Sequence, residues 1–97
     1  MPTFVTLIRW TDQGVRTVKE STKRYREAEK LFQKMGIKTV GFYWTLGRYD
    51  AISLGEAPDD ETVTAAALAI GSKGNVRTET LRAFSLKEMD RILKKVT

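Results

Sequence analysis

The fold is decided by the stretch Trp44-Thr45-Leu46-Gly47-Arg48-Tyr49-Asp50-Ala51-Ile52. It joins two runs rich in β-branched and aromatic residues, residues 37–46 and residues 49–54, through the pair Gly47-Arg48. A two-residue connection led by glycine is typical of a β-hairpin, because glycine adopts the positive φ of the turn without strain. The stretch therefore predicts a hairpin with Gly47-Arg48 as its turn.

The rest of the chain predicts two more strands and three helical regions. Residues 4–10 and 75–84 have strand composition. Apolar residues recur at helical spacing over 12–35 and 62–72, and Ser85 opens a capping box with Glu88 before a last helix. The order βαββαβα predicts an α+β fold of the ferredoxin-like type, βαββαβ with an extra C-terminal helix. Its four-stranded antiparallel sheet would have the spatial order 4-1-3-2, in one domain over residues 1–97.

Alternation along the strands divides the predicted sheet into two faces. The bulkier face, which we expect under the helices, carries Val40, Phe42, Trp44, Leu46, Tyr49 and Ala51. The mixed face carries Thr39, Gly41, Tyr43, Thr45, Asp50, Ile52 and Leu54. The same alternation groups Val5, Leu7 and Arg9 on the first strand, and Arg77, Glu79, Leu81 and Ala83 on the last. The sequence leaves open which face these two groups present, and if they share the mixed face it also carries them. Helices on one side leave the mixed face with apolar groups uncovered. The sequence therefore predicts a homodimer or higher oligomer that packs sheet to sheet.

The mixed face also collects the side chains able to bind a ligand or do chemistry. The predicted ligand-binding set is Arg9, Tyr43, Asp50, Arg77 and Glu79. In an inter-subunit cavity Asp50 could serve as general base and Tyr43 as proton donor, with Arg9 or Arg77 holding an anion. The alternative is structural: Asp50 accepts hydrogen bonds from backbone N–H groups near the hairpin or pairs with an arginine.

Composition excludes several function classes. The chain has neither cysteine nor histidine, so disulfides, thiolate sites and histidine-based metal sites or catalytic triads are excluded, and we expect neither metal nor cofactor. Few amides and 30% charged residues resemble the composition of thermophile proteins. No apolar run reaches the length of a membrane span and no secretion signal is visible, so we expect a cytoplasmic protein without a membrane contact.

The net charge of +5 lies on one segment. Residues 16–38 hold eight basic and three acidic side chains, and the remaining charges balance. An RNA-recognition domain of this topology would need stacking aromatics and a basic-Gly-aromatic run on its central strands. The segment Tyr49-Asp50-Ala51-Ile52-Ser53 lacks that run, so we do not expect nucleic-acid binding.

The motif Gly47, Tyr49 and Asp50 resembles the one that names the GYD domain family. The likeness continues in Thr11-Asp12-Gln13-Gly14 and in residues 74–84. The resemblance implies a dimeric α+β barrel, a superfamily that includes monooxygenases, isomerases and haem-binding proteins. We therefore expect small-molecule binding or assembly through a sheet-to-sheet dimer, and as the alternative a cofactor-independent enzyme that uses Asp50 and Tyr43.

Overall fold

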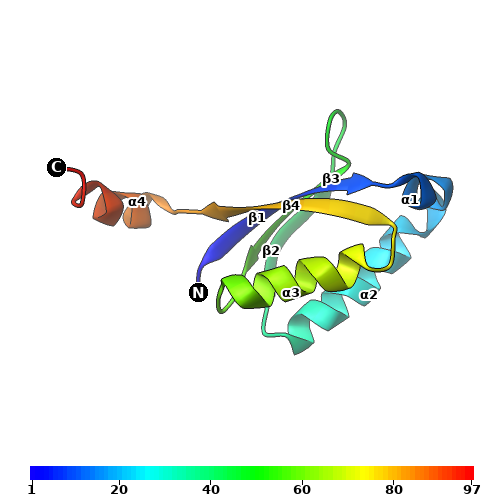
Figure 1. Cartoon of the computed structure of the whole chain (residues 1–97), viewed down its shortest axis with the longest axis horizontal. Helices are drawn as coiled ribbons and strands as arrows, with labels where there is room; N and C mark the ends of the chain where they lie inside the picture. The colour runs from blue at the N-terminus through cyan, green and yellow to red at the C-terminus, as the bar shows by residue number, and fades with distance from the viewer.

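The computed structural model describes residues 1–97 as a four-stranded antiparallel sheet with two long helices on one face (Figure 1). In chain order the elements are β1 (Thr3–Trp10), α1 (Asp12–Arg16), the 3₁₀ turn η1 (Val18–Glu20), α2 (Ser21–Lys34), β2 (Lys38–Trp44), β3 (Ala51–Glu56), α3 (Asp60–Gly71), β4 (Val76–Ala83) and α4 (Leu86–Leu93). The strand order is β2-β3-β1-β4, with every neighbouring pair antiparallel. The predicted ferredoxin-like arrangement is confirmed. None of the helices has the length and apolar character needed to span a membrane.

The first predicted helix is interrupted between α1 and α2. The Arg24 guanidinium donates hydrogen bonds to the carbonyl oxygens of Thr17, at 3.0 Å, and Gly14, at 3.2 Å. Both carbonyls would accept i→i+4 bonds in a continuous helix; the Thr17 carbonyl accepts a bond from the Glu20 N–H at 3.0 Å as well, and the arginine supplies a donor to each of the two. The 3₁₀ turn η1 fills the interruption, and α2 begins at Ser21.

Two of the motif segments, residues 11–14 and 74–75, dock on each other. The Thr11 hydroxyl donates to the Gly74 carbonyl at 2.5 Å, and the Thr11 N–H donates to the Asn75 carbonyl at 3.0 Å. The Gln13 amide donates to the Asn75 side chain at 2.9 Å. At Gly14 a Cβ atom would lie 1.9 Å from the Asn75 carbonyl oxygen, so only glycine allows this approach. The contact fixes α1 beside the start of β4.

The β2–β3 hairpin is wider than the predicted two-residue turn. Gly47 has the expected positive φ of +104°, but β2 ends at Trp44 and β3 begins only at Ala51. The Thr45 hydroxyl donates to the Tyr49 carbonyl at 2.6 Å, which closes a longer loop in place of the tight turn. The connection projects on the side of the sheet away from α2 and α3 (Figure 1).

A β-bulge changes the predicted faces at the start of β2. The expected pairing of even with odd positions holds at Trp44↔Ala51, and the register shifts between Thr39 and Gly41. The extra residue, Val40, is left exposed, whereas Thr39 turns to the helix side. Both had been assigned to the opposite faces, because the alternation rule assumes an unbroken ladder.

The last helix, α4, extends away from the rest of the molecule (Figure 1). Its N-terminus has the predicted capping box, with Ser85 and Glu88 each accepting a hydrogen bond from the other's backbone N–H. Arg82, just before it, forms an ion pair with Glu88 at 3.2 Å and lies over the Phe84 ring at 4.5 Å. These contacts set the direction of α4 as it leaves the sheet.

Candidate functional site: two faces of one sheet

The sheet face away from α2 and α3 is called the open face below. The register places Val5 beside both Leu54 and Leu81, and Leu7 beside both Ile52 and Glu79. Strands β1 and β4 therefore present their odd-numbered residues to this face, and β3 presents its even-numbered residues, as the alternation along the strands predicted. Its apolar part is a continuous strip across three strands, formed by Val5, Leu7, Ile52, Leu54 and Leu81.

No helix or loop of the chain covers this strip. The four central side chains are half-buried by their neighbours alone, and Leu81 is 45% exposed. Monomeric proteins rarely keep a contiguous aliphatic patch on the middle strands of a sheet in water. The open face therefore has the properties of a surface that packs on another protein surface.

One end of the open face is polar. The Arg9 guanidinium lies over the Tyr49 ring, 4.9 Å from its centroid, and the Tyr49 hydroxyl donates to a Glu79 carboxylate oxygen at 3.4 Å. We had expected Tyr49 on the bulkier, helix-covered face. The wider hairpin turns its ring to the opposite side, where it joins two of the predicted ligand-binding residues.

Asp50 is engaged by backbone groups. Its carboxylate accepts a hydrogen bond from the Trp10 N–H at 2.8 Å, and its own N–H donates to the Ile8 carbonyl at 2.8 Å. These bonds extend the β1–β3 ladder beyond its last paired residue. No hydrogen bond joins Asp50 to Tyr43, and no arginine pairs with it. The geometry corresponds to the backbone form of the structural alternative.

The remaining two predicted site residues lie on the edge strands. Tyr43, on β2, is 65% exposed, and its ring leans back over Gly41. Arg77, on β4, is opposite Arg9 in the register and also borders a groove between β4 and α3. The structure therefore groups Arg9, Tyr49 and Glu79 on the open face and leaves Tyr43 and Asp50 apart from each other. No cluster of acidic side chains forms a metal-binding geometry.

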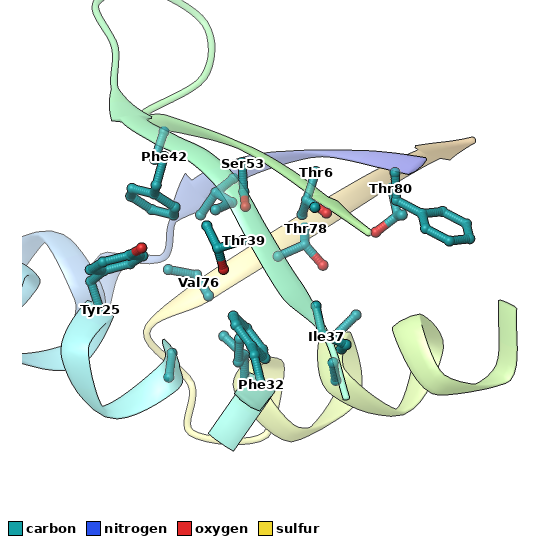
Figure 2. Close-up of a pocket in the computed structure, with 18 of the residues that line it drawn as sticks. Thr6, Tyr25, Phe32, Ile37, Thr39, Phe42, Ser53, Val76, Thr78 and Thr80 are labelled. Carbon is teal, nitrogen blue, oxygen red and sulfur yellow. The ribbon is translucent and has the colours of Figure 1, made fainter. Parts of the chain in front are cut away.

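The helix side of the sheet contains a cavity that the sequence reasoning missed. It has a volume of about 140 Å³ and lies between the sheet and helices α2 and α3 (Figure 2). Its walls are mostly apolar and include Phe4, Ile8, Tyr25, Phe32, Ile37, Phe42, Val63 and Ile70. Five hydroxyl-bearing residues on the sheet complete the lining: Thr6, Thr39, Ser53, Thr78 and Thr80. The sequence did contain a signal for this cavity, because these hydroxyl-bearing residues recur at strand positions that face the helices.

The cavity explains why so few side chains are fully buried. Only four apolar residues of the chain, Phe4, Ala51, Ala57 and Ala66, reach full burial. At one end, the rings of Tyr25, Phe42 and Trp44 contact one another with centroids 4.3 to 5.9 Å apart. Partial burial and the nearby Glu29 carboxylate raise the pKa of the Tyr25 hydroxyl.

Comparison with known proteins gives a family. The GYD domain matches this chain over residues 4–93. The chain belongs to the GYD domain family. A protein of Thermus thermophilus named glutamine synthetase and cystathionine beta-lyase binding protein is 37% identical over 90 residues, which cover 92% of this GYD chain and 95% of the relative. The crystal structure of TTHA0845, also from Thermus thermophilus, is similar with a TM-score of 0.63 and 26% identity, covering 88% of this chain and 95% of that one.

Proposed function

We propose that this GYD-domain protein is an assembly module that associates with itself through the open face and binds a second protein. The observation that carries the proposal is the uncovered aliphatic strip on β1, β3 and β4. The name of the Thermus relative supports the same class of role and supplies two candidate partners, glutamine synthetase and cystathionine β-lyase. The cytoplasmic location expected from the sequence is part of this proposal.

The strip is large enough to drive a two-fold contact. In such a contact the same patch of both copies is buried, so each aliphatic side chain counts twice. Completing the burial of a half-exposed Leu, Ile or Val is worth roughly 1 kcal/mol. Ten such side chains offset the loss of translational and rotational freedom on association, which costs several kcal/mol or more. Leu7 and Ile52, paired at the centre, would contribute most because they are furthest from solvent.

We assign the contact with the second protein to α4. This helix presents an apolar side that packs on no other element, with Leu86 83% exposed, and Val96, just beyond its end, is 69% exposed. Met89 and Leu93 continue the same side of the helix and are also exposed. An amphipathic helix with apolar side chains at three- and four-residue steps is a common ligand for a groove on another protein.

The enzyme alternative stays a prediction from the sequence. It required Tyr43 and Asp50 to act on one ligand in an enclosed space. Asp50 is bonded to the Trp10 N–H, and Tyr43 leans toward Gly41 on an edge strand. No geometric observation favours an acid–base pair there, so we do not develop a mechanism for it.

The experiment that tests the proposal mixes the purified protein with purified glutamine synthetase or cystathionine β-lyase of the same organism and measures complex formation by size-exclusion chromatography with light scattering. We expect a complex with at least one enzyme. The double variant Leu86→Ser/Leu93→Ser should lose it while keeping the self-associated mass of the wild type. A matched control, Lys87→Ser/Lys94→Ser, changes the polar side of α4 and should retain binding. Failure of the wild type to bind either enzyme would refute the partner assignment.

A further inference from the structure

The cavity under the sheet is partly open to solvent and combines apolar walls with a polar row. Thr6, Ser53 and Thr78 lie side by side beneath the sheet and face the space above α2 and α3 (Figure 2). They come from three different strands, β1, β3 and β4, and Thr39 on β2 adds a hydroxyl from the fourth. None of these hydroxyls makes a hydrogen bond within the chain. All therefore face the cavity with hydrogen-bonding capacity to spare.

The hydroxyls are reached by solvent, since no side-chain oxygen of the chain is buried without a hydrogen-bond partner. In the empty cavity they therefore bond to water. A bound molecule that carries a donor or acceptor would displace this water and take over its hydrogen bonds. The polar row therefore indicates a ligand with at least one hydrogen-bonding group on the side that meets the sheet.

The charge of the lining limits the ligand further. Arg24 is the one charged side chain among the lining residues. Its guanidinium is already bonded to the carbonyl oxygens of Thr17 and Gly14 and to the Thr17 hydroxyl at 2.8 Å. No free charge remains to balance an ionised ligand, and burying an unpaired charge is strongly unfavourable. The ligand is therefore uncharged.

Size and ring contacts point to an aromatic body. A volume of about 140 Å³ is close to that of cavities of about 150 Å³ that bind benzene. The Tyr25, Phe42 and Trp44 rings at one end are tilted or edge-on to one another, the arrangement in which a further ring packs well. Tyr25 also offers its hydroxyl as a donor at the α2 side.

We propose that the cavity between the sheet and helices α2 and α3 binds a small uncharged aromatic molecule that carries a hydroxyl, carbonyl or N–H group. The ring occupies the apolar space beside Phe32 and Phe42, and its polar group bonds to the hydroxyls of Thr6 and Thr78, which lie diagonally opposite on the neighbouring strands β1 and β4. The inference is independent of the open face and of α4, so it stands whether or not the protein binds a second protein.

The test is a titration of the full-length protein with phenol, benzene and benzoate, followed by two-dimensional NMR of the backbone amides. We expect phenol to shift the amides of the cavity-lining residues with a Kd on the order of 1 mM, the range for ligands of this size. Benzene should bind roughly five-fold more weakly, because it leaves the hydroxyls without a partner. Benzoate should not bind. Absence of saturable shifts with phenol, or equal shifts with benzoate, would overturn the proposal.

Two variants place the site. Ala67→Leu adds a side chain from α3 into the cavity and should abolish phenol binding, whereas Ala65→Leu, on the exposed side of the same helix, should leave it unchanged. Thr78→Val keeps the shape and removes one hydroxyl, so it should weaken phenol binding about five-fold and leave benzene binding unchanged. If Ala67→Leu does not fold, the phenol-to-benzene ratio in Thr78→Val decides alone. Equal binding of phenol to Ala67→Leu and Ala65→Leu would contradict the assigned place.

Discussion

The two faces of the sheet carry their apolar side chains in different patterns. On the central strands β1 and β3, the helix-covered side mixes Phe4, Ile8 and Ala51 with Thr6, Ser53 and Gly55, whereas the uncovered side carries a continuous aliphatic strip. In a self-sufficient two-layer domain the aliphatic side would lie under the helices. Both proposals rest on this difference: the open face would be covered by protein, and the cavity on the covered face would hold a small molecule.

The largest effect is expected from a charge at the centre of the open face. Leu54→Arg would place two guanidinium groups in the two-fold contact without acidic partners, and we expect self-association to weaken by about 100-fold or more. Light scattering after size-exclusion chromatography measures the change. The same substitution at the fully exposed hairpin tip, Leu46→Arg, is the control and should keep the wild-type mass. Retention of the oligomer by Leu54→Arg would show that the open face is not the interface.

The next largest effect is expected from a backbone clash in the variant Gly14→Ala. Gly14→Ala puts a Cβ atom 1.9 Å from the Asn75 carbonyl oxygen, which no rotamer can relieve. We expect a loss of about 3 kcal/mol in the free energy of unfolding. The matched control is Gly71→Ala, the same substitution at a glycine where an added Cβ atom meets no other atom within 4 Å, and it should change stability little. Chemical denaturation compares the two. A stable Gly14→Ala would mean that α1 does not dock on the start of β4 as described.

Asp50 separates a backbone role from an ion-pair role. Asp50→Ala removes the acceptor of the Trp10 N–H and should cost about 1–2 kcal/mol, whereas Asp50→Asn keeps an acceptor oxygen and should cost much less. Had an arginine been its partner, loss of the charge alone would have been costly. Thermal melts of the two variants measure the difference. Equal destabilisation by Ala and Asn would contradict the backbone role.

The covered face should respond in the opposite sense to the open one. Thr78→Val replaces a hydroxyl that has no partner within the chain by a methyl group of the same size. Because water still reaches this hydroxyl, we expect the free energy of unfolding of the unliganded protein to rise only slightly, by about 0.5 kcal/mol at most, from the added apolar burial of the methyl group. Thr45→Val, which removes a hydroxyl that donates to the Tyr49 carbonyl, should lower it. A loss of stability in Thr78→Val would mean that the hydroxyl has a hydrogen-bond partner within the chain.

The smallest effect concerns the cap of α3, the helix below the cavity. The backbone N–H and hydroxyl of Thr62 lower the pKa of Asp59 below its usual 3.8. The folded state therefore binds this proton less tightly than the unfolded state does. The contribution of the cap is complete above pH 3.8 and is lost as the pH falls below that value. Asp59→Asn keeps a capping oxygen but does not titrate, so its melting temperature should fall slightly less than that of the wild type on acidification.

Much of the fold could be predicted from the sequence, because strand composition, caps and glycines act locally. The element order, the strand order, the capping box at Ser85 and the positive φ of Gly47 all follow from short-range preferences. The bulge at Val40 and the wide hairpin could not be predicted, since both depend on contacts between strands. Tyr49 turns toward Glu79 only because β4 brings that carboxylate to the same end of the sheet.

The candidate site was harder to predict for a similar reason. Alternation correctly grouped Arg9, Glu79 and the aliphatic strip, because period-two patterns survive wherever a strand is regular. The cavity depends on how far α2 and α3 stand from the sheet, and that distance results from packing between segments that are far apart in the sequence. No local pattern encodes it.

Sedimentation equilibrium of the wild-type protein at low micromolar concentration tests the central claim most directly. The account predicts that the open face is covered by a second copy, so the measured mass should be at least twice the 11.0 kDa of one chain. A stable mass of 11.0 kDa across the concentration range would contradict it, because the aliphatic strip of Val5, Leu7, Ile52, Leu54 and Leu81 would then face water.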